Sequence, residues 1–369
     1  MLVKRAVGTT ENSILIVLIA GIGDLILASK SIRAIRNGFP HADIHLLTST
    51  DASSIAQNYP YVDHVWGFPI REMRKSKYYL LDVIKLLFYL RKKRFNLAVN
   101  LYRVSSRIGA LKMGIIFLFL NAKVKVGHDS KGFGGVVTNK VPKATFSDLH
   151  IADAMMLLAR SAGGRPDANG MEIFWDTISE EKWKYLFSAE NQSPHKIDIG
   201  INAGGDRENR RWDPNNYATL ADKLIEKFNA KIILLAGPGE EHISLQIHKK
   251  MKNDSIDLGG KLTVNDLTFI ISKLDLLITN DSGPMHIGAA TQTPLVAIFG
   301  PENPTLFHPH TSSDKYIVVY KHLDCQPCKT KKCDHISCLN DITVSEVFEA
   351  TEKMLSSQHM RELGPPKSY

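Results

Sequence analysis

The stretch TNDSGPMHIGAATQTPLVAIFGP, residues 279–301, decides the fold of this chain. It begins where the apolar run 274–279 ends, and that run has the length and composition of a buried parallel strand. A polar turn at 280–283 follows, and then a helical segment over 284–290 that opens with proline, which the first turn of a helix tolerates. A second apolar run, 295–299, predicts another buried strand. The order strand, turn, helix, strand is typical of a parallel α/β sheet.

The polar turn is a candidate phosphate site. Ligands of open parallel sheets bind beyond the carboxyl ends of the strands, and a helix N-terminus beside Ser282 and Gly283 offers backbone N–H groups to a phosphate or pyrophosphate. A purely structural interpretation also fits: Asp281 and Ser282 cap the helix, Gly283 makes the turn, and His286 is a surface histidine. The residues alone leave both interpretations open.

The same motif resembles the signature of a known family. The pattern DSGPMH at 281–286, with TP at 293–294 and FGP at 299–301, is similar to that of glycosyltransferase family 9, the heptosyltransferases of lipopolysaccharide synthesis. The resemblance covers most of the chain. It implies the GT-B fold, an α/β architecture of two Rossmann-like domains facing across a cleft.

Length and pattern also indicate two α/β domains. A chain of 369 residues is too long for one typical core, and turn-rich segments lie between 165 and 195. We predict an N-terminal acceptor-binding domain over 1–180, a C-terminal nucleotide-sugar-binding domain over 181–356, and a disordered tail over 357–369. Strands are predicted at 13–19, 42–48, 62–68, 95–102, 196–203, 231–236, 274–279 and 295–299, and helices at 25–37, 78–90, 214–228, 264–273, 284–290 and 341–355.

Charge and hydropathy restrict the partners and the compartment. The formal net charge of +8 favours an anionic partner such as nucleic acid, anionic lipid or a phosphorylated saccharide. The apolar runs 14–20 and 114–120 fit neither a secretory signal nor a membrane span. We therefore expect a cytoplasmic protein, or one peripheral on the cytosolic face of the inner membrane. The basic cluster 91–94 is either a solvated helix end or a surface that meets anionic lipid.

Asp24 is the candidate catalytic residue. It follows the predicted strand 13–19 and the turn made by Gly21 and Gly23, at the start of a helix. It can simply cap that helix, or it can act as a general base at the carboxyl end of the strand. The resemblance implies the second role, because the family carries a similar G-x-G-D element whose aspartate deprotonates the acceptor hydroxyl.

Arginines mark the candidate acceptor site in the first domain. Arg71 and Arg74 precede the helix predicted at 78–90, while Arg103 and Arg107 follow a predicted strand. These cations suit the carboxylates and phosphates of an acceptor saccharide, although surface charge alone would also explain them. We expect His128 to extend the positive surface.

The second domain carries the candidate donor site. Loop 204–212 holds three arginines at the carboxyl end of a predicted strand, and the arginine fork suits phosphate oxygens. The resemblance implies that the basic residue two positions before Trp212 contacts the sugar-nucleotide phosphates; this is Arg210, where the family usually has lysine, so the charge is kept and the contact geometry differs. Glu241 is the implied ligand of the ribose hydroxyls, although an acid also suits a first helical turn.

All four cysteines lie close together as Cys325-x2-Cys328-x4-Cys333-x4-Cys338. This spacing predicts a structural zinc site of four thiolates, and a loop of free thiols is the alternative. Disulfides are not expected in a reducing compartment. We expect no metal cofactor in catalysis, because the sequence has no Asp-x-Asp pair to hold a divalent ion.

The leading hypothesis is an inverting transfer of heptose from ADP-heptose to a lipopolysaccharide inner-core acceptor. Asp24 is the base, Arg210 and the helix start at Ser282 and Gly283 hold the diphosphate, and Asp281 and His286 shape the donor pocket. The expected partners are a nucleotide-sugar donor, an anionic lipid-linked saccharide and the inner-membrane surface. The alternatives are a transferase that uses a UDP- or GDP-sugar, a nucleotide-sugar epimerase, and a nucleic-acid-binding protein, which the lack of an aromatic-studded basic motif disfavours.

Overall fold

The chain forms two compact α/β units in the computed structural model, the first ending at Glu172 and the second beginning at Ile173. This division falls within the turn-rich stretch 165–195. The structure describes residues 13–362 except 77, 146–147, 189–196, 329–332 and 334. Among these residues, no helix has the length and apolar character needed to cross a membrane.

The first unit is built on a parallel sheet with the strand order β3-β2-β1-β4-β5-β6. This is the order of a Rossmann fold, in which the chain changes direction between β1 and β4. The apolar run of β1 pairs with β2 on one side and β4 on the other. The strands are β1 (Ser13–Leu18), β2 (Asp43–Ser49), β3 (His64–Phe68), β4 (Leu97–Asn100), β5 (Val124–Asp129) and β6 (Asn139–Pro142).

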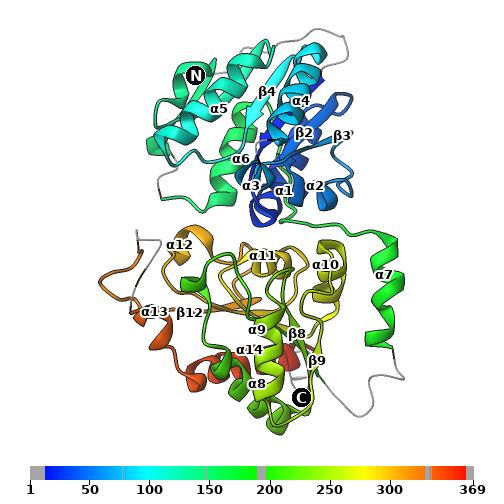
Figure 1. Cartoon of the computed structure of the whole chain (residues 1–369), viewed down its shortest axis with the longest axis vertical. Coiled ribbons are helices and arrows are strands. Elements are labelled where there is room, and N and C mark those ends of the chain that lie inside the picture. Colours follow the sequence, from blue (N-terminus) through cyan, green and yellow to red (C-terminus); the bar gives the residue numbers. More distant parts are fainter. Residues whose placement is uncertain are drawn as a thin grey trace, which may run out of the picture. The chain divides into compact units, whose positions relative to one another are not determined.

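Helices cover both faces of this sheet. One face carries Leu15, Val17 and Leu47, and it packs against the inner sides of α4 and α5. On the other side, α1 packs along α6 (Figure 1). The helices are α1 (Ile22–Gly38), α2 (Thr50–Ala56), α3 (Glu72–Lys75), α4 (Tyr79–Lys93), α5 (Arg107–Phe119) and α6 (Ile151–Ser161), with short 3-10 turns η1 (Phe133–Val136) and η2 (Lys143–Thr145).

A buried arginine holds the end of the first unit against helix α1. Arg33 lies on α1 with its side chain 5% exposed, and its guanidinium binds Asp167 in a two-pronged contact of 2.8 and 2.9 Å. It also pairs with Glu172. Because a buried charge is tolerated only when it is paired, this contact explains why residues 167–172 belong to the first unit.

The second unit repeats the same topology. Its parallel sheet has the order β12-β11-β10-β7-β8-β9, which places the change of direction between β7 and β10. The strands are β7 (Ile197–Asn202), β8 (Ala230–Leu235), β9 (Ile256–Asp257), β10 (Leu276–Asn280), β11 (Leu295–Ile298) and β12 (Tyr316–Val319). Two Rossmann-like units in succession confirm the predicted α/β class.

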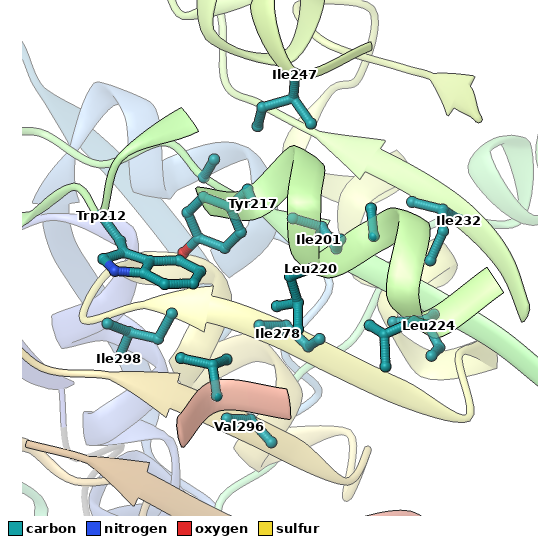
Figure 2. Packing of buried hydrophobic residues seen from close by; sticks show 14 of the residues in the cluster. Ile201, Trp212, Tyr217, Leu220, Leu224, Ile232, Ile247, Ile278, Val296 and Ile298 are labelled. Atoms are coloured by element: carbon teal, nitrogen blue, oxygen red, sulfur yellow. The ribbon is translucent and has the colours of Figure 1, made fainter. Parts of the chain in front are cut away.

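One face of the second sheet forms a large apolar core. Ile201, Ile278 and Ile298 point from the strands toward α8, where Tyr217 stacks edge-on against Trp212 (Figure 2). Helix α14 closes the same core and runs beyond its predicted end at 355, while residues 363–369 lie outside the described part of the chain. The helices are α7 (Thr177–Trp183), α8 (Pro214–Phe228), α9 (Glu241–Lys250), α10 (Val264–Lys273), α11 (Gly283–Ala290), α12 (Pro304–Phe307), α13 (Ser337–Asn340) and α14 (Val344–Glu362).

Candidate active site

Asn280 joins the loop that follows β7 to the turn that follows β10, at the switch point of the second sheet. At the end of β10, its amide nitrogen donates to the carbonyls of Ala203 at 2.8 Å and Gly204 at 3.1 Å. Its amide oxygen accepts from the Trp212 backbone N–H at 3.1 Å and from the Tyr217 hydroxyl at 2.9 Å. The side chain is fully buried. Asn280 therefore holds both ends of the loop 204–212, the arginine loop, against the turn 280–283, the signature turn.

We expect Asn280→Ala to lower the free energy of unfolding of the second unit by at least about 3 kcal/mol, because each buried group that loses its partner costs about 1–3 kcal/mol. Urea denaturation of the variant measures this loss. Asn340→Ala, which alters an exposed amide bonded to the His335 carbonyl, is the matched control and should change stability by about 0.5 kcal/mol or less. Equal midpoints for the two variants would contradict this role.

The arginine loop brings a cation to the signature turn. Arg210 Nη1 lies 3.4 Å from Asp281 Oδ2, and the Arg210 guanidinium also pairs with Glu302. Arg207 reaches Glu302 as well, at 3.3 Å. Asp281 is 4% exposed, and this burial raises its pKa to about 6 against the opposing effect of Arg210. Two predicted donor-site residues, 71 positions apart in the sequence, thus lie together.

His286 lies inside the same site. Its side chain is buried on α11, so the interpretation of a surface histidine is wrong. Burial, together with the positive charge of His310 and Arg210, lowers the pKa of His286 to about 4. The ring is therefore neutral near pH 7, and one of its nitrogens can accept a hydrogen bond.

Unsatisfied polar atoms gather at this point. Among the described residues, nine buried side-chain nitrogen or oxygen atoms have no hydrogen-bond partner, and five of them belong to Asn209, Arg210, Asp281 and His286. Buried polar groups in native proteins are nearly always hydrogen-bonded, so exceptions need an explanation. Their concentration at the switch point, where Rossmann folds bind ligands, is compatible with a site that a polar ligand completes.

The start of α11 is open to such a ligand. Ser282 occupies the capping position, but its side chain does not cap the helix; its hydroxyl donates to the Asn280 carbonyl at 3.2 Å instead. A Cβ on Gly283 would meet nothing within 4 Å, and one on Gly205 would lie 3.8 Å from the Ser282 Cβ. The interpretation of Ser282 as an ordinary cap is therefore wrong, and the helix N-terminus keeps donors for an anion.

The two glutamates after β8 have different surroundings. The Glu240 carboxylate accepts from the backbone N–H of Gly205 at 2.9 Å and of Gly237 at 3.3 Å, and it pairs with Arg211 at 3.2 Å. It braces the arginine loop, a role that the sequence did not reveal. Glu241 is exposed, and the Gly239 N–H, which donates to it at 2.9 Å, lowers its pKa. Its charged carboxylate is accessible to a ligand.

Asp24 lies at the start of α1 and has a raised pKa. It is the third residue of α1, after the extended residue Gly21 at the capping position. Burial raises the pKa of Asp24 to about 6, while a hydrogen bond with the Gly21 backbone opposes that rise. A carboxylate of raised basicity near neutral pH has the property that a general base requires.

The cations of the first unit lie in different surroundings. Arg71 pairs with Asp51 at 3.0 Å. Arg107 is exposed at the start of α5, and Arg103 lines a small pocket beside Leu101. The Arg74 side chain lies outside the described part of the chain.

His128 does not extend the positive surface, and that prediction is wrong. It is buried, and its Nε2 accepts the backbone N–H of Val104 at 2.9 Å, which requires an unprotonated nitrogen. Burial also lowers its pKa. The ring therefore positions the loop that carries Arg103.

The cysteines lie within electrostatic reach of one another. Cys338 is buried, Cys325 is exposed, and Cys328 and Cys333 are half-buried. Burial, and then the charge of the other three thiols, raises the pKa of Cys338 to about 11. Within the part of the chain that the structure describes, groups of three or more potential ligand atoms within 4.8 Å of one another include no cysteine sulfur. The zinc site therefore stays a prediction.

Comparison with known proteins places the chain in a family. The model for "Glycosyltransferase family 9 (heptosyltransferase)" matches residues 83–337. Lipooligosaccharide heptosyltransferase 2 of Campylobacter jejuni is 33% identical over 170 residues, a match that covers 44% of this chain and about half, 52%, of that relative. Lipopolysaccharide heptosyltransferase 1 of Campylobacter coli is 22% identical over 94% of this chain and 99% of its own length.

A solved structure shows the same fold. ADP-heptose lps heptosyltransferase II of Escherichia coli superimposes with a TM-score of 0.73 at 21% identity, covering 94% of this chain and 100% of that one. The two Rossmann-like units are thus those of a GT-B protein. The family match extends over more than half of the chain and includes the signature turn. The chain therefore belongs to glycosyltransferase family 9, the heptosyltransferase family.

Proposed function

We propose that the protein is an inverting glycosyltransferase that moves heptose from ADP-heptose onto a lipid-linked inner-core acceptor of lipopolysaccharide. The observation that carries this proposal is the cluster of Asn209, Arg210, Asp281 and His286 at the switch point of the second unit, each of which has at least one buried side-chain nitrogen or oxygen atom without a hydrogen bond. The names of the relatives, which are heptosyltransferases of lipooligosaccharide or lipopolysaccharide, support the same choice.

The donor binds to the second unit. Arg210 and the backbone N–H groups at the start of α11, beside Ser282 and Gly283, hold the diphosphate. Asp281 and His286 line the sugar-binding part of the pocket, and Glu241 accepts from the ribose hydroxyls. ADP is the preferred nucleotide, in agreement with the name of the structurally similar Escherichia coli enzyme.

The transfer is a single displacement. The Asp24 carboxylate removes the proton of the acceptor hydroxyl as that oxygen bonds to the anomeric carbon of heptose. The bond from this carbon to the diphosphate oxygen breaks, and its electron pair leaves with ADP. Arg210 and the N–H groups of α11 stabilise the charge that develops on the diphosphate, as preorganised donors do. Attack from the side opposite the leaving group inverts the anomeric configuration.

The acceptor binds to the first unit. Arg71, Arg74, Arg103 and Arg107 provide positive charge for its phosphates and carboxylates. Because this saccharide is attached to a lipid, the protein works as a peripheral protein on the cytosolic face of the inner membrane.

The cysteine loop holds a structural zinc ion, and catalysis itself needs no metal. The four thiols of this loop have the ligand chemistry of a structural zinc site, and an ion would draw their sulfur atoms together. Cys325, Cys328, Cys333 and Cys338 would be the ligands, and zinc would fix the conformation of the loop.

Adding zinc to protein purified with a chelator is expected to raise its melting temperature and to release protons, because bound thiols lose theirs. One bound ion per chain by elemental analysis, lost in Cys328→Ser, supports the site. The rate of transfer after full chelation should change little at a temperature where the chain stays folded. A loop that binds less than one ion per two chains would contradict the zinc proposal.

Nucleotide-induced thermal stabilisation tests the donor site. ADP at 100 times its dissociation constant should stabilise the protein by about 2.7 kcal/mol, whereas GDP, UDP and CDP should do so less. Asp281→Ala should remove most of this response, and Asp341→Ala, at an exposed aspartate, should keep it. Stabilisation by UDP or GDP in place of ADP favours the alternative donors. If no nucleotide binds and generic DNA binds with a steep salt dependence, the nucleic-acid alternative replaces the transferase.

A further inference from the structure

The solvent-facing side of α5 is apolar. Ile108, Leu111, Ile115 and Leu118 recur at intervals of three and four residues, and their side chains are 69%, 66%, 56% and 64% exposed. The opposite side of the helix, which includes Phe117, is buried in the core of the first unit. A helix that is hydrophobic all round is normally buried in protein or in lipid, so this outer side needs a partner.

Helix α4 continues the apolar surface. Leu81, Ile84 and Phe88 are 63%, 41% and 52% exposed at helical spacing. The ring of Phe88 packs edge-on against Phe119 of α5, with centroids 5.0 Å apart. The two helices cover the same face of the sheet. We name the outer sides of α4 and α5, formed by Leu81, Ile84, Phe88, Ile108, Leu111, Ile115 and Leu118, the α4–α5 surface.

A groove runs along one border of this surface. It has a volume of about 270 Å³ and lies between α5 and η1. The groove is lined by apolar side chains and by two cations. The apolar residues include Leu111, Ile115 and Leu118 of α5 and Val136 of η1, and the cations are Arg107 and Lys131. An apolar groove with cations among its lining residues matches the junction of an acyl chain with an anionic headgroup.

Most of the net charge of the chain lies in α4, α5 and the segment between them. Residues 79–119 contain eight lysines and arginines and a single acid, Asp82, so they account for +7 of the formal net charge of +8. Lys85, Lys92 and Lys112 are exposed on α4 and α5. Cations that flank exposed leucine, isoleucine and phenylalanine side chains are typical of helices that lie in the interface of an anionic membrane.

We propose that the α4–α5 surface docks on an anionic lipid bilayer, with its apolar side chains among the acyl chains and its lysines and arginines at the headgroups. The docking surface rests on the proposed function, in which the protein is peripheral on the inner membrane, and it assigns that association to named side chains. A second copy of the chain fits less well, because a symmetric pairing would place the same cations opposite one another.

Vesicle flotation tests the docking surface without any donor or acceptor. The full chain should float with vesicles of phosphatidylethanolamine and phosphatidylglycerol at least ten times better than with phosphatidylcholine vesicles. The triple variant Leu111→Ser, Ile115→Ser, Leu118→Ser should lose at least tenfold in bound fraction, and so should Lys85→Glu, Lys92→Glu, Lys112→Glu.

Matched controls use equivalent side chains elsewhere. Ile178→Ser with Leu245→Ser alters apolar residues of α7 and α9 that are 76% and 43% exposed. Lys249→Glu with Lys250→Glu alters exposed lysines of α9. Both pairs should float within twofold of wild type. Unchanged circular dichroism and an unchanged thermal response to ADP in the surface variants show that the fold and the donor site are intact, which separates this test from that of the transferase.

Three results would overturn the proposal. The first is equal flotation with neutral and anionic vesicles, and the second is wild-type flotation of the serine variant. The third is a wild-type dimer in light scattering that the serine substitutions convert to monomer while vesicle binding persists, since the α4–α5 surface would then be an interface between copies.

Discussion

Replacing Asp24 by asparagine is expected to lower kcat by about 100- to 10,000-fold, the usual contribution of a general base. Asparagine keeps the size of the side chain but cannot take a proton from the acceptor hydroxyl. Because Asp24 lies in the first unit, the stabilisation of the variant by ADP should equal that of wild type. Rate measurement with saturating donor and acceptor gives the effect on kcat directly.

The pH dependence supplies a second test of the same residue. The pKa of Asp24 is raised to about 6 by burial, and the base is active only as the carboxylate, which predominates above that pH. The rate should therefore be constant above pH 7 and fall about tenfold per pH unit well below 6. Asp281 has a similar pKa, so saturating donor is needed to separate catalysis from donor binding.

Asp82→Asn, an exposed position on α4, is the matched control and should keep full activity. An Asp24→Asn enzyme with more than a tenth of the wild-type rate would assign Asp24 to helix capping alone.

Arg210→Met is expected to produce the second large loss, about 100- to 1,000-fold in kcat, because it removes a donor to the charge that develops on the leaving diphosphate. It should also weaken ADP binding by more than tenfold, since a hydrogen bond to a charged group contributes about 1.5–3 kcal/mol. Isothermal titration with ADP and initial rates with ADP-heptose measure the two effects.

Two further substitutions test whether the loss is specific to the Arg210 guanidinium. Arg207→Met changes an arginine of the same loop that pairs with the same Glu302 but does not pair with Asp281, and it should cost no more than a few-fold. Arg210→Lys should lie between wild type and Arg210→Met, because lysine keeps the charge and loses the planar fork. Equal effects of Arg207→Met and Arg210→Met would mean that the loop acts only through its net charge.

Most helices and strands could be predicted from the sequence, because long apolar runs ended at clear turn residues. The helices predicted at 214–228 and 264–273 have those bounds in the structure, as α8 and α10. Strands β5, β6, β9 and β12 were not predicted. β5 carries Lys125 and His128 within its six residues, and β12 has only four partly exposed residues. Neither β5 nor β12 has the continuous apolar run that marks a buried strand.

The candidate site could be predicted only in part, because its contacts join distant segments. The motif pointed to Asp281 and His286, and the loop to Arg210, but their common location depends on the strand order that sets β7 beside β10. Asn280 and Glu240 were not predicted as site residues, and only their hydrogen-bond partners reveal that they brace the loop 204–212. The burial of His286 was equally hidden, because one short helix can face the core or the solvent.

Direct observation of glycosyl transfer tests the central claim most directly. The protein is incubated with ADP-heptose and a lipid-linked inner-core saccharide, without added metal, and the products are analysed by mass spectrometry and by nuclear magnetic resonance of the anomeric centre. We predict one heptose added to the acceptor with inverted configuration, one ADP released per transfer, and product formation at least about 100-fold slower with Asp24→Asn. Transfer from a UDP- or GDP-sugar but not from ADP-heptose, or a product of retained configuration, would contradict the account.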